Sequence, residues 1–237
     1  MISKTDNGED LRFHYKLGFK DGKVLLFDID IHAGDFIAPS LESPPFWTAL
    51  DYCQCENCPL SLKDTSHCPV SVNLIPLIEL CSALVSYEDV QFEVTTRERT
   101  VSGDTSLQRA LSSMMGLIMA TSPCPHTEYL KPMAQFHLPL ASPEETIYRT
   151  TSMFLLAQYF LHKQGKDASF DLKKLTEINQ NLQIVNRALA RRFKAAISED
   201  ATLNAIILLN LLSQSVTWSI EDGLEHLRYL FKRYDIE

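Results

Sequence analysis

The sequence has little glycine, with 8 residues among 237. Loops that cradle phosphate groups depend on closely spaced glycines, and the sequence contains no such loop. It also lacks the G-x-S-x-G motif of hydrolase nucleophiles and the H-E-x-x-H motif of zinc peptidases. The familiar signatures of phosphate-binding enzymes, serine hydrolases and zinc peptidases are therefore absent.

Clustered positive charge is also missing. The net charge is −8, and residues 1–100 hold 8 Lys and Arg against 16 Asp and Glu, whereas residues 101–237 hold 14 of each kind. Phosphate backbones are bound by clustered cations, so we expect no nucleic-acid partner. One local basic stripe is present, and we interpret it as a solvated helix face. It consists of Arg187, Arg191, Arg192 and Lys194.

The sequence has no long hydrophobic run. The longest, AIILLNLL at 205–212, is too short to span a bilayer and indicates a buried helix face. The first residues, MISKTDNGEDLRF, contain neither an apolar signal core nor a cleavage site. We therefore expect a cytoplasmic protein with reduced cysteines and no membrane partner. An unidentified protein is the partner class that the sequence leaves open.

The first hundred residues carry strand patterns. Apolar residues alternate over 12–19 and 24–31 around the turn signal Asp21-Gly22, which predicts a β-hairpin. A third strand is predicted over 46–52, and the segments DVQFEVTT and RTVS form a predicted second pair. A helix is predicted over 70–85, where Pro76 marks either a kink or the start.

From Thr105 onward the pattern is helical. Ser142 followed by Pro143 and Glu145 predicts a capped helix start, and the last predicted helices cover about 201–216 and 220–234. We predict an α+β fold in which a small antiparallel sheet with an N-terminal hairpin packs against a mostly helical C-terminal half. The sheet-rich region with the cysteines is 1–104 and the helical region is 105–237, and we expect them to form one integrated domain.

Four of the six cysteines lie in CQCENCPLSLKDTSHCPV, residues 53–70. Cys55 and Cys58 form C-x-x-C, the spacing by which two sulfurs of one tight loop reach a common metal. Cys68 and Cys124 each precede a proline, and proline is favoured at the first helical position. A cysteine just before a helix has its thiolate stabilised by free backbone N–H groups. We therefore predict a zinc site, or alternatively an iron–sulfur cluster, and the predicted ligands are Cys55, Cys58, Cys68 and Cys124.

Other residues compete for these roles. Cys53 is the main substitute ligand, and His67 and His126 are candidate nitrogen ligands, although a lone histidine is more often exposed or bonded to backbone. Cys81 lies in an apolar helix pattern, where a cysteine is usually a small core residue. The three methionines of MMGLIM (114–119) are likewise interpreted as core.

A thiol enzyme or a redox switch is the competing functional class. A low-pKa Cys124 would need a base, for which His137 or His126 is the candidate. We interpret His137, in LKPMAQFHLPLASPEE, as a loop histidine satisfied by backbone. A structural or regulatory metal protein is therefore favoured over an enzyme, with the same thiols acting as a redox switch in the remaining alternative.

The motifs CENCPL, HCPVSVNLIPLIE, TSLQRALSSMMGLIMATSPCP and LKPMAQFHLPLASPEETIYRTTSMFLLAQYF occur in this order along the chain. Together they resemble a bacterial family of uncharacterised proteins that contain a domain of unknown function. The resemblance covers about residues 47–205. It implies a bacterial, cytosolic protein and brings no activity with it.

Overall fold

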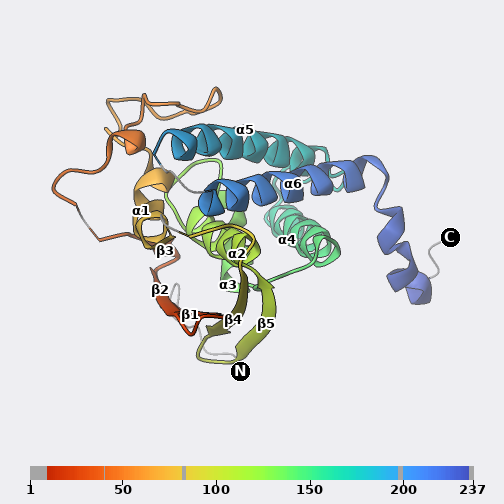
Figure 1. Ribbon diagram of the computed structural model, residues 1–237. Helices are drawn as coiled ribbons and strands as arrows, with labels where there is room; N and C mark the ends of the chain where they lie inside the picture. The colour runs from red at the N-terminus through yellow and green to blue at the C-terminus, as the bar shows by residue number, and fades with distance from the viewer. Residues whose placement is uncertain (1–9, 40, 82–83, 197–199, 235–237) are drawn as a thin grey trace.

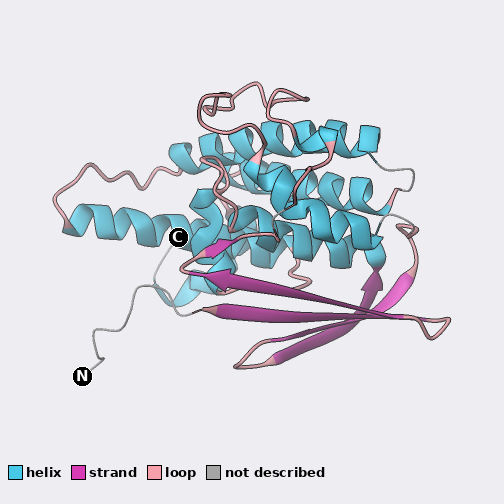
Figure 2. Ribbon diagram, turned by 90° about the vertical axis from the view of Figure 1, so that its left-hand side faces the viewer, coloured by secondary structure: helices cyan, strands magenta, loops and turns pink. Residues whose placement is uncertain are grey.

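The computed structural model describes residues 10–39, 41–81, 84–196 and 200–234. A five-stranded antiparallel sheet lies on one side, and helices are stacked over one of its faces (Figures 1 and 2). The predicted α+β class is confirmed. The strand order is β3-β2-β1-β4-β5. The strands are β1 (Leu11–Phe19), β2 (Val24–His32), β3 (Asp35–Phe36), β4 (Asp89–Thr95) and β5 (Thr100–Ser106).

The predicted N-terminal hairpin is confirmed. Strands β1 and β2 pair antiparallel from Leu11 opposite Ile31 to Gly18 opposite Val24. Gly22 has a φ of +87°, a backbone conformation that glycine adopts without steric cost. The β4 and β5 pair, predicted from DVQFEVTT and RTVS, is present as well. Residues 1–9, which make up most of the segment searched for a signal core and cleavage site, lie outside the described residues.

The sheet is buried on one face only. The alternating residues Phe13, Tyr15 and Leu17 of β1 are at most 4% exposed. Their neighbours on the other face make cross-strand polar contacts, such as Arg12 with Asp30 and His14 Nδ1 with Asp28 Oδ1 at 2.8 Å. This pattern is the one expected where an antiparallel sheet covers a core with one face and meets water with the other.

Six α-helices and three 3-10 segments are present in the described part of the chain. The α-helices are α1 (Pro69–Cys81), α2 (Leu107–Ala120), α3 (Lys131–Gln135), α4 (Pro143–Lys163), α5 (Lys173–Ala196) and α6 (Ala201–Glu221). The 3-10 segments are η1 (Phe46–Thr48), η2 (Glu128–Leu130) and η3 (Glu225–Tyr234). The segment predicted as a helix over 220–234 is therefore mostly 3-10, and α6 continues to Glu221.

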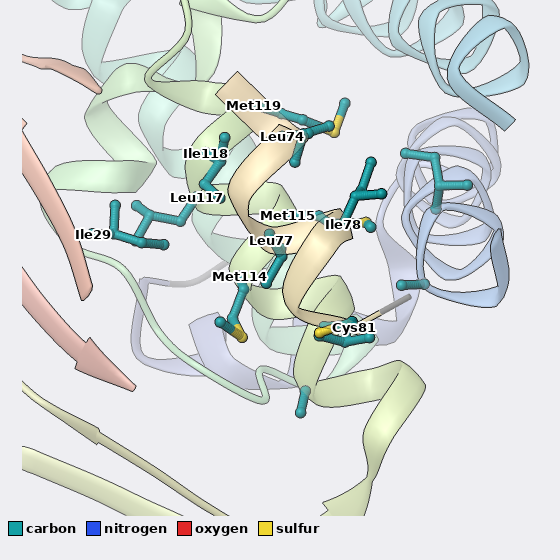
Figure 3. Close-up of a cluster of buried hydrophobic side chains, with 14 of the residues drawn as sticks. Ile29, Leu74, Leu77, Ile78, Cys81, Met114, Met115, Leu117, Ile118 and Met119 are labelled. Carbon is teal, nitrogen blue, oxygen red and sulfur yellow. The ribbon is translucent and has the colours of Figure 1, made fainter. Parts of the chain in front are cut away.

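Helix α2 lies at the centre of the molecule, in contact with the sheet, α1 and α6. Figure 3 shows α1 and α2 packed through a cluster of apolar side chains. Met114 and Met115 are fully buried and Cys81 is 2% exposed, so the interpretation of these residues as core is confirmed. Pro76 lies inside α1 rather than at its start.

The predicted strand over 46–52 is wrong. Phe46–Thr48 form the 3-10 segment η1, and a turn follows. The Thr48 hydroxyl donates to the Pro45 carbonyl at 2.7 Å, and the Thr48 N–H donates to the same oxygen at 2.9 Å. These local bonds take the place of a strand ladder, which leaves Ala49 opposite His67 as an isolated bridge.

Helix α6 is long and apolar enough to cross a membrane by length and composition alone. The core helix of a soluble protein meets the same criterion. Because α6 contacts α2, α4 and α5 within the fold, its placement is consistent with a soluble protein. The helix predicted over about 201–216 is thus present as α6, which extends five residues further, to Glu221.

The start of α4 confirms the predicted capping box. The Ser142 Oγ accepts from the Glu145 N–H at 3.1 Å, and the Glu145 Oε2 accepts from the Ser142 N–H at 2.7 Å. Replacing Ser142 by Ala removes the first of these bonds, and we expect the free energy of unfolding to fall by about 1 kcal/mol. Urea denaturation measures this change.

The matched control for Ser142→Ala is Ser152→Ala. Ser152 is an exposed residue in the interior of the same helix. Alanine is the better helix former, so this second variant should be as stable as the parent or slightly more stable. Equal loss of stability in the two variants would show that the cap contributes nothing.

Candidate functional site

The cysteine segment leaves and re-enters the fold at one place. The Leu50 N–H donates to the Ser66 carbonyl at 2.9 Å, and the Cys68 N–H donates to the Thr48 carbonyl at 2.8 Å. The intervening loop, 51–65, therefore begins and ends beside Cys68. Figure 1 shows this loop, in orange, over the end of α5 that lies next to α1.

The C-x-x-C motif forms a tight turn. The Cys58 N–H donates to the Cys55 carbonyl at 3.0 Å, which closes the turn around Glu56 and Asn57. The Asn57 Nδ2 donates to the Asn181 Oδ1 of α5 at 2.9 Å and thereby anchors the turn. Both cysteines are half-buried.

The Cys-Pro sequences at Cys68 and Cys124 differ in structure. The Cys68 carbonyl accepts from the Val72 N–H at 3.0 Å, so Cys68 is the residue that caps α1, and Pro69 is its first helical residue as predicted. Cys124 instead opens a turn, in which its carbonyl accepts from the Thr127 N–H at 3.0 Å. The predicted helix start at Cys124 is wrong, because the next element is the three-residue η2.

His126 connects the Cys124 turn to the C-x-x-C turn. Its Nε2 lies 2.7 Å from the Asn57 carbonyl, to which it donates. His126 is thus bonded to backbone, as expected for a lone histidine. The His67 Nδ1 lies 3.0 Å from the Thr48 Oγ1, whose hydrogen goes to Pro45. His67 therefore donates from Nδ1, and its Nε2 remains an acceptor.

The four predicted thiols share one electrostatic neighbourhood. The pKa of Cys55 is raised to about 12, first by burial and then by Cys68, Cys58 and Cys124. Burial also raises the pKa of Cys124, against the opposing effect of backbone N–H groups. Charges act on one another only when they are near, so the three chain segments bring these thiols together. The raised pKa of Cys124 contradicts the low-pKa thiol that an enzyme would need.

Cys53 does not join this group. It is absent from the residues that shift the pKa of Cys55, and it lies in a turn with a φ of +47°. All six cysteines are free. Among the described residues, no group of three or more His, Cys, Asp or Glu side chains is already arranged to hold a metal ion.

Arg192 is the functional neighbour that the sequence-based interpretation missed. It is 1% exposed, and its Nη1 donates to the carbonyls of Trp47 and Ala49, both at 2.7 Å. Its Nη2 donates to the Leu50 carbonyl at 3.1 Å. No ion pair joins it to a carboxylate within the described ranges. Of the influences on Cys55, Arg192 is the one that lowers its pKa.

The solvated-face interpretation is right for the rest of the basic stripe and wrong for Arg192. Arg187, Arg191 and Lys194 are exposed. Arg192 lies three residues after Leu189 and seven after Val185, which places it on the apolar stripe of α5. Helical spacing was therefore the signal for its burial.

His137 belongs to a different cluster. Its Nε2 lies 2.9 Å from the Tyr15 hydroxyl and 3.4 Å from the Ser113 Oγ, and its ring meets Phe13 edge-on. The expectation that backbone satisfies this ring is wrong, since side chains of β1 and α2 do so. Burial and, secondarily, the charge of Arg149 lower the pKa of His137 to about 3. The ring is neutral and joins the sheet to the helices.

The family model for the domain of unknown function DUF6901 matches residues 13–232, so the chain belongs to that family. The resemblance to a family of unknown function is thus confirmed over nearly the whole chain. No curated protein and no solved structure matches the chain.

Arg192→Met should destabilise the protein by roughly 2–5 kcal/mol, because three buried carbonyls lose their donor. Urea denaturation gives the change in the free energy of unfolding. Arg191→Met is the matched control, since Arg191 is exposed, and its effect should stay within about 0.5 kcal/mol. Similar stability of the two variants would show that the bonds from Arg192 to the three carbonyls do not stabilise the fold.

His137 should make folding stability depend on pH. Its folded-state pKa of about 3 lies below the unfolded value of about 6.5, so its contribution is complete above the unfolded value and is lost as the pH falls towards 3. Because the ring is only partly buried, we expect a loss of about 1–2 kcal/mol between pH 7 and pH 5. His137→Gln should remove this loss.

The control for His137→Gln is His162→Gln, because His162 is exposed near the end of α4. Urea denaturation of the parent and both variants at the two pH values separates the contributions. The His162 variant should keep the pH dependence of the parent. An unchanged dependence in His137→Gln would show that His137 titrates alike in the folded and unfolded states.

Proposed function

We propose that Cys55, Cys58, Cys68 and Cys124 bind a single zinc ion that fastens the 51–65 loop to the start of α1 and to the turn after α2. The observation that carries this proposal is the meeting of three cysteine-bearing segments. His126 donates to the Asn57 carbonyl of the C-x-x-C turn, the Cys68 N–H donates to the Thr48 carbonyl beside the loop, and the thiols raise the pKa of Cys55. The C-x-x-C turn, the capping residue of α1 and the Cys124 turn are each held by backbone hydrogen bonds.

The donor set suits zinc. Structural zinc sites are closed by four protein ligands, and four cysteine sulfurs form one of the common sets. The described side chains are not yet at the spacing of a bound ion, so binding has to draw the thiols together. Residues 51–65 contain no helix or strand, so closure does not require a regular element to be broken.

The positive charge of Arg192 suits a zinc ion held by four thiolates. Four thiolates around one divalent ion carry two net negative charges, and a buried guanidinium beside them supplies a compensating positive charge. The same guanidinium holds the carbonyls of residues 47, 49 and 50, from which the loop departs. One side chain therefore both balances the charge of the thiolates and positions the loop that carries two of them.

The role that follows is structural or regulatory. A metal held by Cys55 and Cys124 links segments that lie far apart in the chain. Because the unfolded chain lacks this site, binding stabilises the folded state. The free thiols suit a reducing, cytoplasmic location. An iron–sulfur cluster on the same four residues is the alternative cofactor.

Metal analysis and visible absorption of the full chain, purified without air, test the proposal. We expect a colourless protein with a single zinc ion per chain, because zinc is redox-silent. A brown protein with iron and sulfide would replace zinc by the iron–sulfur alternative. Protein that takes up neither metal would overturn the proposal and leave a thiol switch as the explanation of the cluster.

Cys58→Ser should lose the metal and lower the midpoint of thermal unfolding together. Cys53→Ser and Cys81→Ser are the matched controls and should keep the metal. Cys53 lies outside the thiol group, and Cys81 lies in the core, where the new hydroxyl should cost about 1–3 kcal/mol without metal loss. Full metal content in Cys58→Ser would remove it from the ligand set.

A further inference from the structure

A cavity of about 520 Å³ lies within the helical part of the molecule. Its walls come from α2, α4, α5 and α6, and the segment 130–141 contributes the remaining side. Figure 1 shows α2 and α4 below α5 and α6, the four helices that supply these walls. None of the proposed zinc ligands lines it. Its volume lies in the range of small-molecule sites, roughly 300–1,000 Å³.

The lining is mainly aliphatic, and its charge has one sign. Arg109 and Arg149 are among the lining residues, whereas no Asp or Glu is. Such a surface favours a ligand with an apolar body and an anionic group. Leucines on the helices of this wall are Leu117, Leu182, Leu208, Leu209, Leu211 and Leu212.

Asn186 places a buried polar group on this wall. It is 3% exposed, and its Oδ1 has no hydrogen-bond partner. Asn179 and Leu182 lie on the same face of α5 and also line the cavity. Asn179, by contrast, is satisfied through its Nδ2, which donates to the Leu175 carbonyl at 2.9 Å. A buried acceptor without a partner is costly, and a donor group on a ligand would relieve it.

Arg109 and Arg149 both donate hydrogen bonds to backbone carbonyls of the segment that forms one side of the cavity. The Arg149 Nη2 donates to the Phe136 carbonyl at 2.7 Å and to the Met133 carbonyl at 3.1 Å. The Arg109 Nη2 donates to the Leu140 carbonyl at 3.0 Å. A guanidinium has five N–H donors, so each keeps donors beyond these bonds. Since Arg109 is exposed, the rim with its positive charge reaches solvent.

We propose that this cavity binds a small apolar carboxylic acid whose carboxylate meets Arg149 and Arg109 and whose hydrogen-bond donor meets Asn186. The aliphatic lining takes the hydrocarbon body. A neutral or cationic molecule of the same length gains nothing from the arginines, and a purely apolar one leaves Asn186 unpaired. This inference stands apart from the zinc proposal, because the two sites share no residue.

Binding to the full-length protein can be measured with anilinonaphthalene sulfonate, an apolar anion that fluoresces in dry sites, and with dodecanoate as competitor. We expect the probe to bind and dodecanoate to displace it. Dodecyltrimethylammonium, with the opposite charge, should displace it at least about tenfold less well, and Arg149→Gln should reduce this preference. No binding of probe or fatty acid, or equal competition by the cation, would overturn the proposal.

Asn186→Leu separates a ligand contact from a structural role. Removal of an unpaired buried amide should raise the midpoint of thermal unfolding, while the affinity for ω-hydroxydodecanoate should fall about fivefold to tenfold. The affinity for dodecanoate, which has no hydrogen-bond donor, should change little. A variant in which both acids bind as before would overturn the assignment of Asn186.

The matched control is Asn210→Leu. Asn210 of α6 has an Oδ1 that is buried and unpaired as well, yet it does not line the cavity. This variant should become more stable without any change in affinity for either acid. Equal losses of affinity in the two asparagine variants would show a general effect of helix packing and would contradict a site in the cavity.

Discussion

The buried guanidinium of Arg192 is the constraint on which the cysteine region depends. A charge that is 1% exposed persists only if its donors are satisfied, and the carbonyls of Trp47, Ala49 and Leu50 satisfy them. These carbonyls belong to the short segment that replaces the predicted strand. Because that segment pairs with 66–68, Arg192 fixes both ends of the 51–65 loop and therefore the position of the thiols.

Helix α2 is in contact with each of the other features described above. Its C-terminal end leads directly to Cys124, and Ser113, in its middle, reaches His137 and through it the sheet. Gly116 faces α6, where an added Cβ would lie 3.4 Å from the Leu209 Cδ2. A glycine at this position lets α6 approach closely beside the cavity. One central helix thus contributes to the thiol cluster, to the contact with the sheet and to the cavity wall.

The features that could be predicted from sequence are the local ones. The hairpin turn at Gly22 and the capping box at Ser142 each depend on residues within a few positions of one another. The strand predicted over 46–52 failed for two reasons: Thr48 bonds locally to Pro45, and the carbonyls of the segment accept from the distant Arg192 instead of a neighbouring strand. The tight turn of the C-x-x-C motif was predicted from its spacing, whereas the unpaired state of Asn186 is a property of tertiary packing that no spacing reveals.

Helix α5 connects the two proposed sites. Asn181 holds the C-x-x-C turn and Arg192 holds the base of the loop, while Asn186 between them lines the cavity. Six residues of α-helix separate Asn186 from Arg192, a rise of about 9 Å. A helix is stiff over such a length, so a displacement of α5 moves the loop contacts and the cavity wall together. The cysteine loop and the cavity wall therefore depend on the position of the same helix although the two sites share no residue.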